Sequence, residues 1–315
     1  MIEPTVVDSL VPPPSVVLDV VEGSFRSRAR NELVNPAKIY TKLGNDGIAI
    51  SMLATHRAKG FSVVKNYFES SSDSRHRGDS FAHFTVYSES GEAPLLTLND
   101  SWITNARSSA VSTLMIRELA TFGRGRVVIL GLGKLGLALL DFLPFMDSGD
   151  FEAVGFSRKE ETVDRWLAAA EQRETAVPVR AHNSFNELME DLAGADVVIA
   201  TTGAGGIGFV QNSWLPKKCL SVYVGYGFAA NVMHETDRLY TTSQAQMEVT
   251  CPELRDSDGK IRNADLEFHE ILMGRTVDRV QENERVFAYN SGLAVNDLAL
   301  VEHLVTKLNS AELVA

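Results

Sequence analysis

The first third of the chain carries short hydrophobic runs with polar residues between them. After the prolines at positions 12–14, the spacing predicts a helix over residues 15–30. Strands are then predicted at residues 37–42, 47–53, 60–68, 81–88 and 93–98. The turn sequences Asn45-Asp46-Gly47 and Ser90-Gly91-Glu92 separate neighbouring runs, which favours an antiparallel sheet. Residues 70–80 are serine-rich and charged, and we expect a mobile loop there.

From residue 126 onward, predicted strands alternate with helices, which favours an α/β fold with a doubly wound parallel sheet. The strands are expected at residues 126–130, 151–156, 177–181, 194–200, 221–225 and 238–242, and a last one begins at 286. A closing helix to residue 307 is apolar on one side, so it should pack back on the N-terminal sheet. The predicted domains are residues 1–122 with 293–315, and residues 123–292.

A Gly-x-Gly-x-x-Gly sequence lies at the first strand-to-helix turn of the alternating part. Gly131 permits the tight turn, Gly133 lets the backbone approach a pyrophosphate, and Gly136 lets the helix pack close to the strand. The helix N-terminus then offers unpaired N–H groups to phosphates. The alternative is an ordinary turn of an α/β core. Because a strand flanks this unit on each side, the sequence favours a dinucleotide site of the Rossmann type.

The end of the second strand of this unit selects between cofactors. Sites that prefer NAD place an Asp or Glu there, whereas this chain has Ser157 followed by Arg158 and Lys159. A hydroxyl, a guanidinium and an ammonium can hold a 2′-phosphate that a carboxylate would repel. The sequence therefore predicts NADP(H), with a solvated basic turn as the alternative.

Further cofactor contacts are expected where the fourth strand ends, because ligands of such sheets lie at the carboxyl ends of the strands. The predicted cofactor-binding residues are Thr104, Gly131, Leu132, Gly133, Lys134, Leu135, Gly136, Ser157, Arg158, Lys159, Thr201, Thr202, Gly203, Ser291 and Gly292.

Composition narrows the choice of partners. A formal charge of −11 over 315 residues argues against a general nucleic-acid or membrane surface, which would reward a basic excess. The N-terminus lacks the pattern of a secretory signal, and the only thiols, Cys219 and Cys251, fit a reducing cytoplasm. Cys219 is interpreted as a buried thiol rather than a nucleophile. No metal-ligand spacing is present, so we expect no metal.

A polar helix face precedes the nucleotide unit. Thr104, Arg107 and Ser108 fall at i, i+3 and i+4, so a cation and two hydroxyls share one side of the helix start. This group suits a carboxylate or a phosphate. A capped helix with a surface arginine is the alternative.

Three stretches resemble the ornithine cyclodeaminase and mu-crystallin family, over roughly residues 35–307. The strand that ends in Lys65-Asn66 is similar to the family's strand with an active-site lysine. The helix start Ile103-Thr104-x-x-Arg107-Ser108-x-Ala110 resembles Thr-x-x-Arg-Thr-x-Ala. The segment Ser291-Gly292-x-Ala294-x-x-Asp297 resembles the family's Gly-x-Ala-x-x-Asp motif.

The resemblance implies a homodimer whose N-terminal sheets join, so that residues 1–122 with 293–315 form a substrate and dimerisation domain. It also implies hydride exchange at the α-carbon of an amino acid or its imine. By the same resemblance, Lys65 and Arg107 would hold the substrate carboxylate, and Lys65 could also donate a proton. Lys38 stands where some members have a carboxylate-binding arginine. The alternative for Lys65 is a solvated lysine on an edge strand.

The chain departs from the family at Tyr226, which aligns at or near an aspartate that handles the amino group in cyclodeaminases. A phenol cannot replace a carboxylate as a base at neutral pH, although it can donate a hydrogen bond. The predicted catalytic residues are therefore Lys65, Arg107 and Tyr226. The favoured hypothesis is NADPH-dependent reduction of a carboxylated imine, or the reverse amino-acid dehydrogenation. The alternatives are redox-neutral cyclodeamination and a crystallin-like protein that binds NADP and a small ligand.

Overall fold

The computed structural model describes residues 7, 9–43, 47–69, 80–88, 91, 95–100, 102–147 and 150–312. Of the predicted loop at residues 70–80, residues 70–79 lie outside the described residues and residue 80 begins a strand. Most of the predicted turns at 45–47 and 90–92 also lie outside the described residues. The chain divides into two compact units: unit 1 is residues 1–107 with 292–315, and unit 2 is residues 108–291.

The division falls inside helix α3 (Ile103–Leu119), whereas the sequence placed the boundary after that helix, at residue 122. The later turns of α3 are tied to unit 2 by hydrogen bonds. Asn290 Nδ2 donates to Ser108 O over 3.0 Å, and the N–H of Val280 donates to Leu119 O over 2.9 Å. A buried backbone carbonyl needs such partners, so these turns belong with unit 2.

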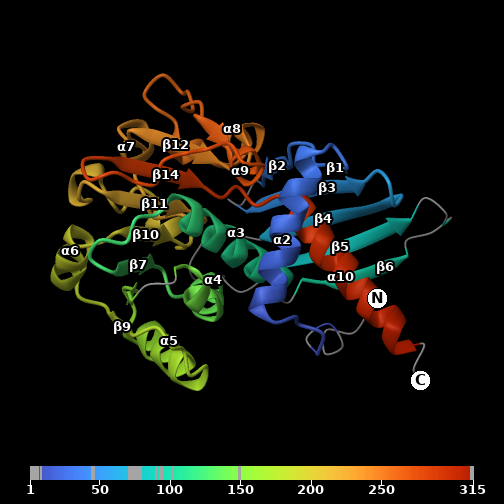
Figure 1. The fold of residues 1–315 in the computed structure, drawn as a ribbon, viewed down its shortest axis with the longest axis horizontal. Helices are drawn as coiled ribbons and strands as arrows, with labels where there is room; N and C mark the ends of the chain where they lie inside the picture. Colours follow the sequence, from blue (N-terminus) through green and yellow to red (C-terminus); the bar gives the residue numbers. More distant parts are fainter. Residues whose placement is uncertain are drawn as a thin grey trace. The chain divides into compact units, whose positions relative to one another are not determined.

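Unit 1 contains an antiparallel sheet with the strand order β1-β3-β4-β5-β6, and β2 pairs with β3. The strands are β1 (Leu33–Val34), β2 (Ile39–Lys42), β3 (Ile48–His56), β4 (Phe61–Glu69), β5 (Ser80–Ser88) and β6 (Leu96–Asn99). Helices α2 (Pro14–Ala29) and α10 (Ala294–Glu312) run side by side, blue and red in Figure 1, and α10 packs on β3 and β4. The predicted return of the C-terminal helix to the N-terminal sheet is confirmed.

One face of this sheet forms the core of unit 1. Alternate residues of β3, β4 and β5 are buried, among them Met52, Val63, Phe84 and Val86. Lys65 lies in the same rows, opposite Met52 on β3 and Phe84 on β5. Side chains of a strand point alternately to the two faces, so Lys65 shares the buried face.

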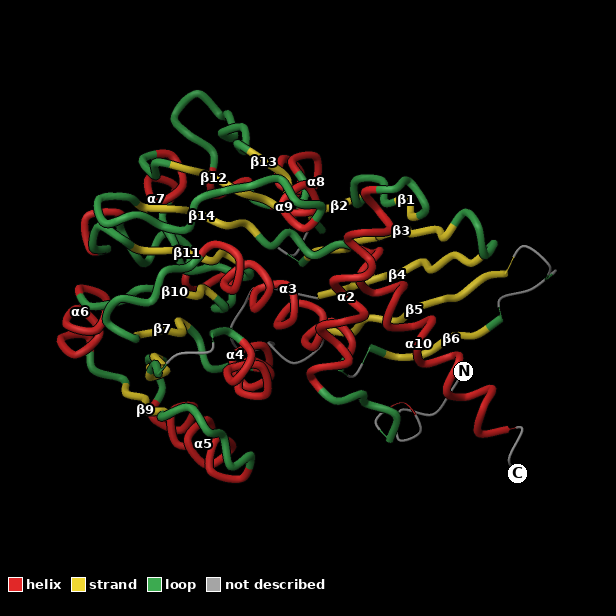
Figure 2. Tube along the Cα trace, viewed as in Figure 1, coloured by secondary structure: helices red, strands yellow, loops and turns green. Residues whose placement is uncertain are grey.

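Unit 2 contains an eight-stranded parallel sheet in the order β13-β12-β14-β11-β10-β7-β8-β9 (Figure 2). Its strands are β7 (Arg126–Leu130), β8 (Glu152–Phe156), β9 (Val179–His182), β10 (Val197–Ala200), β11 (Cys219–Tyr223), β12 (Arg238–Thr241), β13 (Leu266–Glu267) and β14 (Arg285–Tyr289). The chain runs from β7 outward through β8 and β9, then returns to the other side of β7 at β10. The predicted doubly wound sheet is confirmed, with its switch point between β7 and β10.

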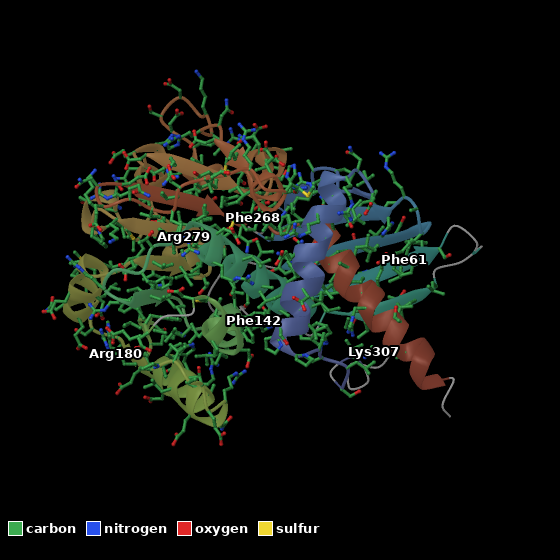
Figure 3. All side chains as sticks on the ribbon, in the orientation of Figure 1. Phe61, Phe142, Arg180, Phe268, Arg279 and Lys307 are labelled. Atoms are coloured by element: carbon green, nitrogen blue, oxygen red, sulfur yellow. The ribbon has the colours of Figure 1, made fainter. Side chains whose placement is uncertain are left out.

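The helices of unit 2 differ in detail from the expectation. The helix after the glycine turn is α4 (Lys134–Leu139), which continues as a 3-10 segment, Leu140–Phe145, that contains Pro144. The remaining helices are α5 (Glu160–Gln172), α6 (Phe185–Ala193), α7 (Ala230–His234), α8 (Gln244–Thr250) and α9 (Phe268–Leu272). Phe142 and Phe268, labelled in Figure 3, are buried in unit 2. Helices α7, α8 and α9 and strand β13 were not predicted, because they are too short to show a hydrophobic period.

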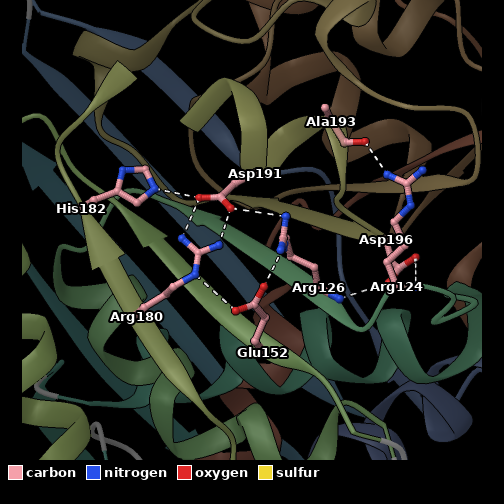
Figure 4. A network of polar contacts seen from close by, with 8 residues as sticks. All are labelled: Arg124, Arg126, Glu152, Arg180, His182, Asp191, Ala193 and Asp196. Atoms are coloured by element: carbon pink, nitrogen blue, oxygen red, sulfur yellow. Dashed lines mark hydrogen bonds and ion pairs between the residues drawn. The ribbon is translucent and has the colours of Figure 1, made fainter. Parts of the chain in front are cut away.

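An ion-pair network holds one edge of the parallel sheet (Figure 4). Asp191 of α6 pairs with Arg180 of β9 over 2.9 Å and with His182 over 2.8 Å, while Arg126 of β7 and Glu152 of β8 pair over 2.7 Å. Burial raises the pKa of Asp191, but hydrogen bonds from Arg180 and His182 outweigh it and hold that pKa below its ordinary value. The network fixes α6 against β9, beside the strand that ends in the predicted cofactor residues.

Candidate active site

Unit 2 has a cavity of about 300 Å³ at the carboxyl ends of β7, β8 and β10. Its lining residues are Gly131, Leu132, Gly133, Phe156, Ser157, Arg158, Lys159, Thr162, Thr201, Thr202, Gly203, Gly205, Gly206 and Phe209. Nine of the predicted cofactor-binding residues are therefore brought together. Lys134, Leu135 and Gly136 belong to α4 and do not line the cavity, and Ser291 lies elsewhere in unit 2, where its hydroxyl meets that of Thr242 at 2.6 Å.

Two glycines of the turn have no room for a side chain. Gly131 has a φ of +97°, and a Cβ there would lie 2.9 Å from the backbone nitrogen of Thr202. A Cβ on Gly136 would lie 2.3 Å from the carbonyl oxygen of Gly131. A Cβ on Gly133, by contrast, would meet no described atom within 4 Å. Gly131 and Gly136 thus shape the turn, while Gly133 leaves open space beside the backbone, where a phosphate could approach.

The loops around the cavity are held by threonine hydroxyls. Thr201 Oγ1 donates to Gly131 O over 2.6 Å, and Thr202 Oγ1 donates to Tyr226 O over 2.8 Å. The backbones of Thr202 and Tyr226 also pair with each other. Tyr226 therefore lies beside the loop that lines the cavity, and its partly buried ring packs against the core of unit 2.

The predicted selectivity residues lie on the wall formed by the end of β8. Arg158 and Lys159 are exposed, and Arg158 Nη2 donates to Gly205 O over 3.3 Å, so the guanidinium reaches toward the glycine-rich loop after β10. None of the described lining residues is acidic. The cavity can therefore accept a polyphosphate without repulsion from a carboxylate.

Unit 1 contains a buried cluster of charges that we call the charge cluster: Lys65, Asp100, Arg107 and Asp297. Lys65 Nζ lies 3.2 Å from Asp100 Oδ2 and 3.8 Å from Asp297 Oδ1, and Arg107 Nε donates to Asp297 Oδ1 over 3.0 Å. Lys65 is only 3% exposed and its strand, β4, lies between β3 and β5. The alternative of a solvated lysine on an edge strand is wrong, because the register puts Lys65 on the buried face.

Gly292 makes room for the arginine of the cluster. It adopts a φ of +66°, and a Cβ there would lie 2.4 Å from Arg107 Nη1. Lys38 Nζ donates to the carbonyl oxygen of Gly292 over 3.3 Å. The predicted substrate-binding residues Lys38, Lys65 and Arg107 are thus gathered in unit 1, around the start of α10.

Asp100 is a member of the cluster that the sequence did not predict. Burial raises the pKa of Asp100, but the charge of Lys65 and hydrogen bonds from Thr104 outweigh it and keep that pKa below its ordinary value. Asp297 Oδ2 is buried and has no hydrogen-bond partner among the described residues. Thr104, which was predicted to bind the cofactor, bonds to Lys65 and Asp100 through its hydroxyl.

A larger cavity, of about 460 Å³, is lined by residues that precede β7, β10 and β11, among them Arg124, Asp196 and Lys218. It lies at the amino ends of these parallel strands, whereas ligands of such sheets bind at the carboxyl ends. We therefore do not assign it to the cofactor.

Burial raises the pKa of the Cys219 thiol to about 12, which supports its interpretation as an inert thiol. Within the described part of the chain, no group of side chains is suited to a metal ion and no helix is long and apolar enough to cross a membrane.

Comparisons with known proteins agree with the fold. A sequence model of the ornithine cyclodeaminase/mu-crystallin family matches residues 14–312. The nodulation efficiency protein NfeD of Rhizobium meliloti is 21% identical over 290 residues, which is 90% of this chain and 87% of that protein. The structure of Thermococcus litoralis Δ1-pyrroline-2-carboxylate reductase with NADH and L-proline is similar, with a TM-score of 0.78, 16% identity, and coverage of 95% of this chain and 94% of that chain. An archaeal alanine dehydrogenase dimer with bound NAD has a TM-score of 0.77 at 16% identity, with coverage of 98% and 96%.

Proposed function

Since the chain belongs to the ornithine cyclodeaminase/mu-crystallin family, we propose that it is an NADPH-dependent oxidoreductase acting on C–N bonds. It reduces a carboxylated imine to an amino acid, or dehydrogenates the amino acid in the reverse direction. The substrate is a cyclic ketimine, such as a pyrroline- or piperideine-carboxylate, or an imine formed from a 2-oxo acid and an amine. The observation that carries this proposal is the buried pairing of Lys65 and Arg107 around Asp297, in a chain that also has a glycine-lined cavity at the carboxyl ends of β7, β8 and β10.

The residues around the cavity of unit 2 fit NADP(H). The turn at Gly131 and Gly136 has no space for side chains, and Gly133 leaves the approach to the backbone open for the pyrophosphate. Ser157, Arg158 and Lys159 would hold the 2′-phosphate, because the wall they form carries two cations and no carboxylate. When bound, the reduced cofactor supplies the hydride.

The charge cluster would bind the substrate carboxylate. Arg107 directs its Nε at Asp297, so its two terminal nitrogens, which lie against Gly292, are the donors we assign to that carboxylate. Lys65 would give a second contact and, as an ammonium, a proton for the substrate nitrogen. Lys38, which bonds to Gly292 O, lies at the same helix start and is a third candidate. A carboxylate gripped in this way fixes the adjacent carbon, and such positioning carries much of a hydride transfer.

Tyr226 would donate a hydrogen bond and would not act as a base. Its backbone pairs with Thr202, whose loop lines the cofactor cavity. Cyclodeamination needs a group that handles the amino nitrogen as a base, and a phenol does not do this at neutral pH. For this reason we prefer net imine reduction to redox-neutral cyclisation.

A homodimer built on the N-terminal sheet completes the proposal. The sheet face that α10 does not cover exposes apolar side chains, with Ile39, Leu53 and Tyr87 exposed by 69%, 43% and 41%. Exposed apolar patches of this kind commonly mark protein interfaces. Light scattering on the purified protein tests this, since a monomer at working concentrations would contradict it.

The central test follows NADPH absorbance with a panel of cyclic imines and of 2-oxo acids mixed with amines, with NADH in parallel. We expect oxidation of NADPH with at least one carboxylated imine and loss of at least about 100-fold in kcat/KM in Arg107→Lys, which keeps the charge but not the forked geometry. Ammonia release without net change of cofactor would select cyclodeamination. Stabilisation by NADPH and by imino acids without any turnover would select a ligand-binding protein.

A further inference from the structure

Asp100 directs its two carboxylate oxygens to different tasks. It lies between β6 and α3, and its Oδ1 accepts the backbone N–H of Thr104 over 3.0 Å, as a helix-capping residue does. Its Oδ2 accepts the hydroxyl of Thr104 and lies 3.2 Å from Lys65 Nζ. Capping needs only the first oxygen, so the second interaction calls for another explanation.

Lys65, Thr104 and Asp100 form a closed ring of polar contacts. Lys65 Nζ donates to Thr104 Oγ1, whose own proton goes to Asp100 Oδ2. The aromatic ring of Phe84 on β5 lies next to these contacts, with its centroid 5.0 Å from Lys65 Nζ. A carboxylate, a hydroxyl and an aromatic ring, each on a different element, thus surround the ammonium.

The charges that face Lys65 come from α3, from the turn before it and from α10, and not from the two neighbouring strands. Asp100 lies on the turn before α3, Asp297 at 3.8 Å on α10, and Arg107 on α3 shares Asp297 with it, while β3 and β5 contribute the uncharged Met52 and Phe84. Asp297 pairs with both Lys65 and Arg107, whereas Asp100 pairs with Lys65 alone among the described residues. In this apolar setting a charged group needs a partner to stay charged.

We propose that Asp100 is a positioning residue: together with Thr104 it fixes the Lys65 ammonium and keeps it charged for the substrate. The role in turnover rests on the proposed function. The fixing and charging of Lys65 does not, and it can be measured in the free protein.

The test is Asp100→Asn. The amide keeps an acceptor for the N–H of Thr104 and so retains the cap, but it removes the negative charge beside Lys65. We expect kcat/KM to fall by up to about 100-fold at neutral pH. We also expect the alkaline limb of its pH profile to move to lower pH, because the ammonium has lost its nearest opposite charge. Asp141→Asn, which alters a surface pair with Arg173, should leave the limb unmoved. If Asp100 only caps α3, the limb will stay in place, and the proposal is overturned.

Thr104 supplies a second variant that keeps both charges. Thr104→Val opens the ring, so we expect a lower kcat/KM with the alkaline limb unchanged, and Thr104→Ser should restore activity. Wild-type activity in Thr104→Val would contradict the positioning role even if Asp100→Asn did not fold.

A measurement without turnover separates this inference from the proposed function. In protein labelled with ¹⁵N-lysine, the Nζ signal of Lys65, assigned by its loss in Lys65→Arg, is followed against pH in the wild type and in Asp100→Asn. Loss of the ammonium signal at lower pH in the variant supports the inference even if no imine is reduced. An unchanged titration refutes it even if imines are reduced.

Discussion

The cavity of unit 2 and the charge cluster of unit 1 each contain two cationic side chains, but they differ in what surrounds these cations. In the cavity, Arg158 and Lys159 are exposed at the rim, and glycine backbone forms the turn beneath them. In the cluster, Lys65 and Arg107 are 3% and 7% exposed, and each already has a carboxylate within 3.2 Å.

Because of this difference, substitutions in the two regions should affect different properties of the protein. An exposed cation costs the folded state little when it is removed, so changes at the rim should alter ligand binding alone. A buried charge left without its partner carries a large desolvation cost, so changes in the cluster should alter folding and function together. Substitutions in the two regions can test this separation.

Removing Asp297 should have the largest effect on stability. Asp297→Ala leaves Arg107 buried without its carboxylate, and we expect the free energy of unfolding to fall by about 3–5 kcal/mol. Urea denaturation measures this. In the matched control Asp141→Ala, the lost partner Arg173 has a side chain that is 34% exposed, so the expected loss is about 0–1 kcal/mol. Equal losses in the two variants would show that the cluster is not special.

Two glycine variants should separate the two roles that we assign to the turn at residues 131–136, namely to maintain the shape of the turn and to leave space for a pyrophosphate. In Gly136→Ala the new Cβ meets Gly131 O at 2.3 Å, so the turn must open, and we expect about 1–3 kcal/mol of destabilisation together with weak NADPH binding. In Gly133→Ala no described atom obstructs the Cβ, so stability should be retained while the approach of the pyrophosphate is blocked. Urea denaturation and calorimetric titration with NADPH measure the two effects. Normal NADPH affinity in Gly133→Ala would place the phosphates elsewhere.

Arg158→Ala tests the rim alone. We expect a loss of about 10- to 100-fold in NADPH affinity, no change for NADH and no change in stability, because an exposed guanidinium that holds a phosphate contributes about 1.5–3 kcal/mol. Titration with NADPH and with NADH measures the two affinities. Arg165→Ala removes an exposed arginine of α5 and serves as the control. Equal losses for NADPH and NADH in Arg158→Ala would mean that the side chain contacts a part common to both.

The two regions also differ in how far the sequence predicts them. The glycine turn is local: Gly131, Gly133 and Gly136 lie within six residues, and their task depends on the strand and helix that they join. The basic wall at Ser157 follows directly from the end of β8. Nine of the predicted cofactor-binding residues could therefore be placed around one cavity from the sequence alone, although Lys134 and Leu135 only begin helix α4 and do not line it.

The charge cluster depends on contacts between distant segments. The motifs identify Lys65 and Arg107, but the face on which Lys65 lies is set by its register between Met52 and Phe84. Asp100 shows one local signal, a carboxylate just before a helix, which predicts a cap. Asp100 also pairs with Lys65 on β4, but only the folded sheet brings these two residues together. This second role could therefore not be predicted from the local sequence.

The smallest expected effect is a pH dependence in the network of Figure 4. Its carboxylate Asp191 has a pKa below the ordinary 3.8, so its ion pairs stabilise the fold above that value and are lost as the pH falls through the lowered pKa. Asp191→Asn should therefore lose stability at neutral pH, by about 1 kcal/mol because the Arg180 side chain is 41% exposed, and its unfolding free energy should fall less on acidification than that of the wild type. Urea denaturation at neutral pH and near pH 3 measures how much the unfolding free energy of each protein falls on acidification. Asp164→Asn, on the exposed side of α5, serves as the control. The carbonyl oxygen of His182 accepts the N–H of Ser157 over 3.3 Å, but no side chain of the network lines the cavity of unit 2. NADPH affinity should therefore stay unchanged, and a loss of affinity in Asp191→Asn would show that β9 and α6 hold the end of β8 in place.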